Sequence, residues 1–236
     1  MLALQTIAEA VLLEKYASHG ERDADDIRRR VARELRDASY RASVALAQER
    51  GAFPLSDARQ YLAPPRFASR LPDDIKADIA RHGMRNSHLL AIAPTGTISL
   101  AFADNASNGI EPAYAWIYTR RKRMPEGTQR AYRVEDHAFR VYREMYGIGD
   151  DPAQLPPHFV TALDIGALDH MRMSTAVQPY IDTAISKTVN VPADYPFADF
   201  HDLYVEAWRS GLKGLTNYRP NAVVGSVLEV PCRIAS

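Results

Sequence analysis

A short turn at residues 93–99 has the residue types that bind an anion. It reads Ala-Pro-Thr-Gly-Thr-Ile-Ser and follows a brief apolar run, so a buried strand feeding a tight turn is expected. Glycine lets the main chain approach a ligand closely, and backbone N–H groups at a helix start attract negative charge. The pattern predicts an anion cradle, with Gly96 in a conformation that a β-carbon would disfavour. The alternative is an ordinary turn whose hydroxyl groups cap the helix.

A second polar stretch, residues 108–112, reads Asn-Gly-Ile-Glu-Pro. Asn108 and Gly109 mark a turn, and Glu111 stands directly before a predicted strand. Its carboxylate either orients a ligand or caps the backbone. We regard Asn108, Gly109 and Glu111 as candidate lining of a pocket.

Residues 184–190 are predicted to form a strand with a polar face. Successive side chains of a strand point to opposite faces, so Ser186, Thr188 and Asn190 share one of them. Such a face either lines a polar pocket or is simply half exposed. Ser186 and Asn190 are therefore added to the candidate pocket lining.

Metal chemistry is not expected from this sequence. No two of the seven histidines stand four residues apart, which is the spacing of a helical metal site. Cys232 is the only cysteine, which excludes an internal disulfide and a zinc site built from cysteines. We find no nucleophile elbow and no redox pair of cysteines, so no catalytic residue is predicted.

The elements that position these residues follow from periodicity and from start and stop residues. Helices are expected over residues 2–18, from Asp23 to Gly51 and over 72–83, with a loop at 55–70. Strands are expected at 88–93, 114–120, 184–190 and 212–218, and helices at 134–146, 167–181 and 197–209. Strand and helix alternate, which predicts an α/β fold and leaves barrel or doubly wound sheet open. We divide the chain into a helical segment, 1–83, and a segment carrying the turn, 84–236.

The overall charge balance argues against nucleic acid or a membrane surface as a partner. Twenty-nine basic residues balance 29 acidic ones, and no run approaches the ~18 apolar residues of a membrane span. The basic run at 120–123 is interpreted as a solvated strand end or loop. A single free thiol and the lack of a signal peptide predict a cytoplasmic protein.

Four segments together resemble the large catalytic chain of ribonucleotide reductases. The first two are the turn at 93–99 and Asn-Ala-Ser-Asn-Gly-Ile-Glu-Pro at 105–112. The later two are Tyr-Ile-Asp-Thr-Ala-Ile-Ser-Lys-Thr-Val-Asn at 180–190 and Gly-Leu-Lys-Gly-Leu-Thr-Asn-Tyr-Arg at 211–219. Because all four stand in the family's order, the chain is identified as a member.

The resemblance implies a ten-stranded α/β barrel of two five-stranded halves, of which this chain supplies the second half and a helical segment before it. It implies reduction of ribonucleotides to 2′-deoxyribonucleotides by radical chemistry, with an external dithiol as reductant. The substrate's phosphates are bound by a turn whose residues match Pro94, Thr95, Gly96, Thr97 and Ile98, with Ser99 at its edge.

The resemblance is to the adenosylcobalamin-dependent class. Enzymes that receive their radical from a partner subunit carry two adjacent tyrosines near residue 217, where this chain has Thr216 and Asn217 before a lone Tyr218. A large chain of that other class, diverged at the tyrosine pair, is one alternative. A catalytically dead phosphate-binding or scaffold remnant is another.

One departure from the family concerns the cysteine that becomes a thiyl radical. In the family it lies N-terminal to the region matched here, and Cys232 stands outside any such loop. The isolated chain is therefore expected to be inactive, a fragment that a complementary N-terminal chain would complete.

Overall fold

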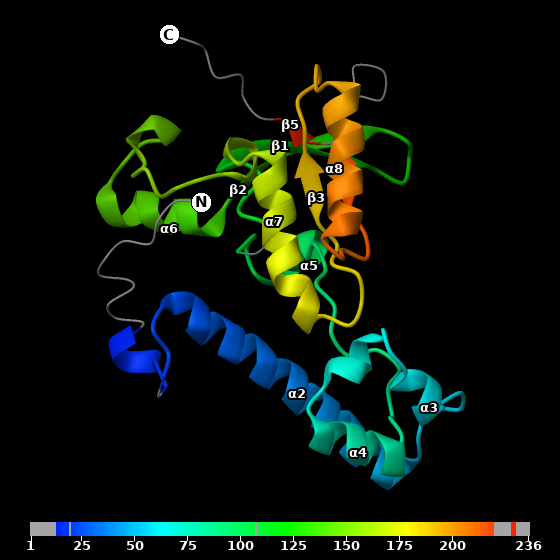
Figure 1. Ribbon diagram of the computed structural model, residues 1–236. Helices are drawn as coiled ribbons and strands as arrows, with labels where there is room; N and C mark the ends of the chain where they lie inside the picture. Colours follow the sequence, from blue (N-terminus) through cyan, green and yellow to red (C-terminus); the bar gives the residue numbers. More distant parts are fainter. Residues whose placement is uncertain (1–12, 19, 107, 220–227, 230–236) are drawn as a thin grey trace. The chain divides into compact units, whose positions relative to one another are not determined.

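The computed structural model describes residues 13–18, 20–106, 108–219 and 228–229 (Figure 1). They form two compact units. Unit 1 comprises the residues up to Ala91 together with Ala176–Ala184. Unit 2 comprises Ile92–Thr175 and the residues from Ile185 onward. None of the described helices is both long and apolar enough to cross a membrane.

Unit 1 is organised around the long helix α2, Ala24–Arg50. Asp23 caps its start by accepting the backbone N–H of Asp26 at 2.8 Å, and Gly51 ends it with a φ of 80°. Both ends agree with the prediction from the sequence. Of the predicted helix over residues 2–18, residues 13–16 are helical and residues 17–18 are not, and residues 2–12 lie outside the described residues.

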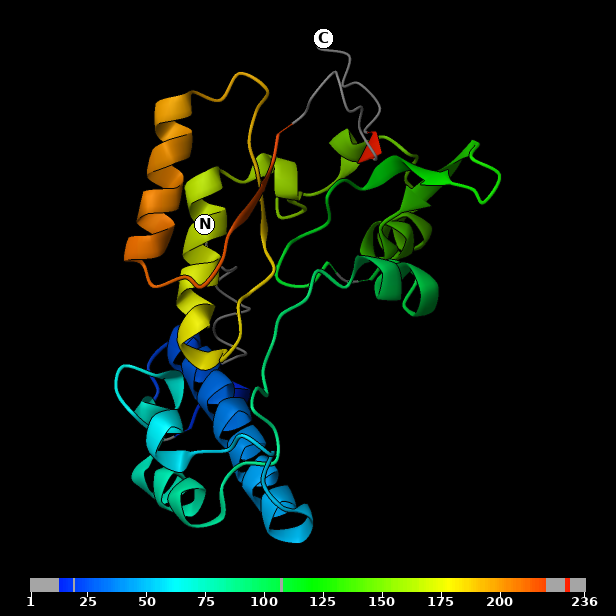
Figure 2. The same cartoon turned by 90° about the vertical axis from the view of Figure 1, so that its right-hand side faces the viewer.

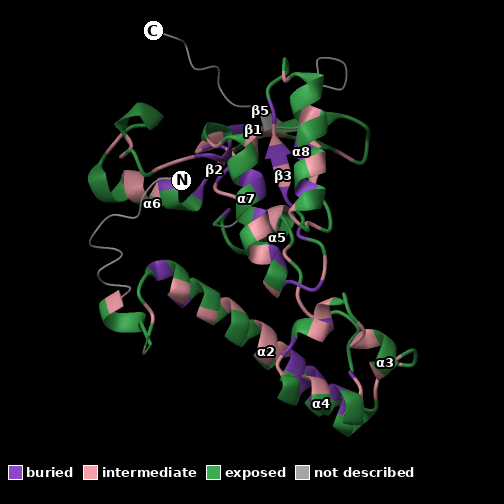
Figure 3. Cartoon of the chain, in the orientation of Figure 1, coloured by how far each residue is buried: buried purple, intermediate pink, exposed green. Residues whose placement is uncertain are grey.

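The core of unit 1 lies between α2 and the segments that follow it, which are α3 (Ala58–Tyr61), the 3₁₀ turn η1 (Phe67–Arg70) and α4 (Asp73–His82). Figure 3 shows the buried residues of α2 and α4. The core residues are Tyr40, Val44, Ala68, Leu71, Ile75, Ile79 and Met84. The prediction that 55–70 is only a loop was wrong, because Asp57 caps α3 and Phe67 stacks on Tyr40, bringing this segment into the core.

A distant segment completes unit 1. It contains the 3₁₀ turn η4, Gln178–Tyr180, and the buried Asp182. The Asp182 carboxylate accepts the Tyr40 hydroxyl at 2.9 Å and the amides of Leu89 and Leu90 at 2.8 and 2.9 Å. Asp182 thus ties α2 to residues 89–90, which the sequence places far from it.

Unit 2 contains a two-stranded parallel sheet, formed by β3 (Thr188–Asn190) and β4 (Thr216–Tyr218). Helices α7 (Ala167–Val177) and α8 (Phe197–Arg209) lie alongside β3 in both views (Figures 1 and 2). Their shared core consists of Met171, Val189, Val191, Leu203 and Ala207. The prediction for α8 matches the structure at both ends, whereas the two predicted strands are shorter than expected.

A second sheet of unit 2 is a hairpin of β1 (Ile117–Arg123) and β2 (Gln129–Glu135), with β5 (Leu228–Glu229) on the other side of β1. The basic run 120–123 belongs to β1. This strand ends at Arg123, three residues after the predicted end at residue 120. β2 was missed, and the helix predicted from 134 begins later, as α6 (His137–Tyr146). Most of β2 is exposed, so no hydrophobic alternation marks it in the sequence.

The predicted strand at 88–93 is reduced to one parallel bridge, between Ile92 and Ile185. Short helices complete unit 2: α5 (Gly96–Phe102), η2 (Pro152–Gln154) and η3 (Ala162–Asp164). The expectation of a mixed α/β fold is confirmed, but the described residues form no closed barrel.

Candidate functional site

The turn predicted to bind an anion opens directly into α5. Among the described residues, no acceptor is found for the backbone N–H groups of Gly96, Thr97 and Ile98, the first three of this helix. Thr97 and Ile98 are exposed and Gly96 is half-buried. The first turn of α5 therefore presents three successive amide donors, as an anion cradle requires.

Other residues of the turn differ from the prediction. The left-handed conformation falls on Thr95, with φ 56° and ψ 6°, and Gly96 has no positive φ and open space where a β-carbon would stand. The expected constraint on Gly96 was wrong, because Thr95 itself makes the reversal that α5 needs. Pro94 is exposed, while Ser99 is buried and donates its amide to the Thr95 carbonyl at 2.7 Å. Ser99 thus belongs to the body of the helix.

The segment around Gly109 packs directly against the start of the turn. Gly109 has a φ of 71°, and a β-carbon there would overlap the carbonyl oxygen of Ala93 and stand 3.5 Å from the Pro94 Cα. Only a residue without a β-carbon allows this approach. The second motif and the turn are therefore neighbours, and Gly109 carries the constraint that was predicted for Gly96.

Glu111 connects the same segment to β3. Its Oε1 accepts the backbone N–H of Thr188 at 2.8 Å and lies 3.2 Å from the Nζ of Lys187. The carboxylate therefore caps a backbone amide, one of the two roles left open by the sequence. Burial lowers the pKa of Lys187, and the nearby Glu111 carboxylate opposes that change.

Lys187 is a residue that the sequence reasoning missed. Its side chain is 1% exposed, between the buried Ile185 and Val189. A signal was present, because strand alternation places Lys187 in phase with those two apolar residues and out of phase with Ser186. A lysine on the buried face of a strand requires a partner, which the sequence alone does not identify.

The polar face of residues 186–190 is more open than the opposite face, as its alternation predicts. Ser186 is exposed, and Thr188 and Asn190 are half-buried. Ser186 donates its amide to the Ile92 carbonyl at 2.9 Å, which places it beside the strand end that feeds the turn. Asn190 pairs with Tyr218 of β4, further along the sheet.

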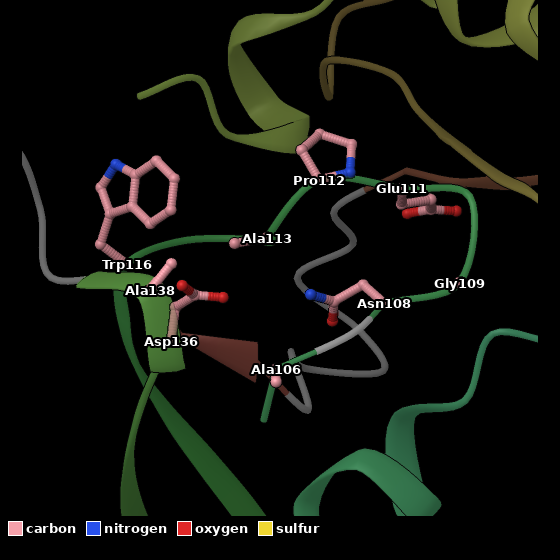
Figure 4. A pocket seen from close by; sticks show the side chains of 9 residues that line it. All are labelled: Ala106, Asn108, Gly109, Glu111, Pro112, Ala113, Trp116, Asp136 and Ala138. Atoms are coloured by element: carbon pink, nitrogen blue, oxygen red, sulfur yellow. The ribbon is translucent and has the colours of Figure 1, made fainter. Parts of the chain in front are cut away.

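A cavity of about 300 Å³ lies beside the second motif (Figure 4). Its lining consists of Ala106, Asn108, Gly109, Glu111, Pro112, Ala113, Trp116, Asp136 and Ala138. Burial raises the pKa of Asp136, which also caps α6 through the amide of Phe139. Ser186 and Asn190 are not part of this lining. In the described part of the chain, no three His, Cys, Asp or Glu side chains are grouped as metal ligands.

Comparisons with known proteins agree with the motifs. The family model described as ribonucleotide reductase, barrel domain, matches residues 5–218. A vitamin B12-dependent ribonucleoside-diphosphate reductase of Mycobacterium tuberculosis (strain CDC 1551 / Oshkosh) is 34% identical over 215 residues, covering 84% of this chain and 28% of the relative. A vitamin B12-dependent ribonucleotide reductase of Streptomyces coelicolor is 33% identical over 168 residues, covering 63% and 17%.

A more distant relative, the vitamin B12-dependent ribonucleoside-diphosphate reductase of Thermoplasma acidophilum, is 29% identical over 219 residues, covering 87% of this chain and 26% of the relative. The chain thus spans about a quarter of the length of such relatives. The match of the family model nevertheless includes the first three sequence motifs in full and the fourth as far as Tyr218. The chain belongs to the ribonucleotide reductase family, and its residues 5–218 match the model of that family's barrel domain.

Proposed function

We propose that this chain is the part of a vitamin B12-dependent ribonucleotide reductase that binds the phosphate groups of the substrate. The observation that carries the proposal is the open first turn of α5, with three amides that have no acceptor among the described residues. The relatives are named as reductases of ribonucleotides, and for the whole enzyme we propose conversion of ribonucleotides to 2′-deoxyribonucleotides.

The chemistry of the turn suits a phosphate group. Backbone N–H groups at a helix start bind phosphate oxygens without a charged side chain, and the helix dipole adds to the attraction. Pro94, Thr95, Gly96, Thr97 and Ile98 form the proposed site, and Ser99 supports it from within α5. Ser186 lies near this site, because its amide donates to the carbonyl of Ile92, two residues before Pro94.

The remaining features of the enzyme are proposed from the family. Residues 84–236 would form the second half of a ten-stranded α/β barrel, and the helical segment 1–83 would precede it. An external dithiol would supply the reducing electrons, and a complementary chain the thiyl cysteine. We propose that the enzyme works in the cytoplasm.

Adenosylcobalamin is the cofactor proposed for the whole enzyme, where it would supply the initiating radical. The cavity beside Glu111 does not fit it. Its volume of about 300 Å³ is at the lower end of the range for drug-sized ligands, and adenosylcobalamin is several times larger than such a ligand. We therefore assign none of the cavity's residues to the cofactor and place its site elsewhere in the enzyme.

The phosphate site predicts which amide signals respond to a nucleotide. Titration of the chain with a ribonucleoside diphosphate should shift the NMR signals of the Gly96, Thr97 and Ile98 amides, because their N–H groups would donate to phosphate oxygens. Pyrophosphate should compete and the nucleoside without phosphate should not. The Lys122 amide on β1 is the control for nonspecific attraction, because an exposed cation attracts any anion weakly. Shifts at residues 120–123 without shifts at 96–98 would refute the site.

The family's chemistry also predicts what the chain does not do alone. The 236 residues contain one cysteine, and the turnover of ribonucleotides needs a thiyl radical beside the substrate, at a position N-terminal to the matched region. With adenosylcobalamin and dithiothreitol, we expect no 2′-deoxynucleotide from this chain by chromatography. A mycobacterial relative, run in parallel, is the positive control. Measurable turnover by the chain itself would show the assignment of the cysteine to be wrong.

A further inference from the structure

The ion pair of Lys187 and Glu111 is the most deeply buried one in the described part of the chain. The Lys187 side chain is 1% exposed and that of Glu111 19%, and their charged atoms are 3.2 Å apart. Each residue belongs to a different sequence motif. The pair therefore links residues 76 positions apart in the sequence at the place where the motifs meet.

A lysine costs free energy at this position. Its ammonium group loses its hydration, and an apolar side chain of similar length would pack between Ile185 and Val189 without that cost. A buried ion pair is therefore weak evidence for stability, whereas in some proteins such a pair fixes a specific geometry. Here the group held beside the ammonium is the Glu111 carboxylate.

Glu111 occupies the place of a missing strand. Ser186 donates its amide to the Ile92 carbonyl, as in a parallel sheet, and Thr188 is the next residue to donate on that edge. The segment that contains Ile92 no longer runs beside this edge, because it turns away at Pro94. The Glu111 carboxylate accepts the Thr188 amide instead, at 2.8 Å. The sheet edge is thus completed by a side chain at the point where the turn departs.

Glu111 is also two residues from Gly109, which packs on the Ala93 carbonyl. We propose that Lys187 is a positioning residue of the phosphate turn: by fixing the Glu111 carboxylate on β3, it holds Gly109 against Ala93 and keeps the first turn of α5 in place. The part of this inference that concerns phosphate rests on the proposed function. The part that concerns the geometry of the turn does not.

The test compares Lys187→Met with Lys122→Met, the same substitution at an exposed lysine of unit 2. Native-state hydrogen exchange reports the turn and the sheet edge, and titration with pyrophosphate reports binding. In Lys187→Met we expect exchange at the Thr188 amide, and at the Ser99 amide that donates to the Thr95 carbonyl, to rise about tenfold or more, the factor for losing one charge-assisted hydrogen bond. Pyrophosphate binding should weaken about tenfold. Lys122→Met should change neither.

A second variant separates positioning from general stability. In Glu111→Gln with Lys187→Met, the glutamine oxygen still accepts the Thr188 amide and no charge is left without a partner. We expect exchange at Thr188 and binding to return most of the way to those of the unchanged chain. A double variant as perturbed as Lys187→Met would overturn the proposal, and this holds even if Lys187→Met alone fails to fold.

Two further outcomes are decisive. Exchange that rises equally throughout unit 2 in Lys187→Met, α8 included, would show a structural role only and overturn the proposal. If the unchanged chain does not bind pyrophosphate, the proposed function fails, while the exchange at the Thr188 and Ser99 amides still decides whether Lys187 positions the turn.

Discussion

Replacing Gly109 by alanine should destabilise unit 2 by at least about 2 kcal/mol and abolish phosphate binding at the turn. Two costs combine. The backbone of residue 109 has a φ of 71°, which strains an L-residue by about 1–2 kcal/mol, and the new methyl group would overlap the Ala93 carbonyl oxygen. Because Ala93 and Pro94 lead into α5, relief of the overlap must displace the turn itself. Urea unfolding and pyrophosphate titration measure the two effects.

Gly96→Ala is the matched control for that prediction. Gly96 stands in the turn against which Gly109 packs, has no positive φ and has no atom within 4 Å of the position of a β-carbon. Because alanine is the better helix former, the substitution should change stability by no more than about 1 kcal/mol, in the stabilising direction. If Gly96→Ala were as costly as Gly109→Ala, the close approach of Gly109 to Ala93 would not be the constraint that shapes this turn.

The second large effect is expected in unit 1, at Asp182. Its carboxylate is buried and accepts the Tyr40 hydroxyl and two backbone amides, so Asp182→Ala leaves three donors without this acceptor. Removing one member of such a buried, charge-assisted network costs about 3–5 kcal/mol. We expect the free energy of unfolding, measured by urea denaturation followed by circular dichroism, to fall by that amount.

Two controls define the origin of this loss. Tyr40→Phe removes one donor and leaves Asp182 bound to the amides of Leu89 and Leu90, so its cost should be about 1–2 kcal/mol. Asp78→Ala makes the same substitution as Asp182→Ala at an exposed position of α4 and should be nearly neutral. Should Tyr40→Phe cost as much as Asp182→Ala, the two amides would contribute nothing and the network would reduce to one hydrogen bond.

The sequence by itself determined what depends on neighbouring residues. Asp23 and Gly51 delimit α2, and the apolar period of 197–209 defines α8, because capping and helical periodicity act within a few residues. The four motifs likewise identified the family, and the alternation of residues 185–190 indicated which side chains share a face. In each case the information lies along a short stretch of chain.

Only the tertiary structure decided which residues complete one another over long separations. It moved the glycine constraint from Gly96 to Gly109, because the constraint arises from the Ala93 carbonyl and not from the turn's own conformation. It also supplied Glu111 as the partner of the buried Lys187. Residues 88–93 have the composition of a strand yet form one bridge, since a strand exists only where a neighbour offers backbone partners. Such partners come from packing, which no local pattern encodes.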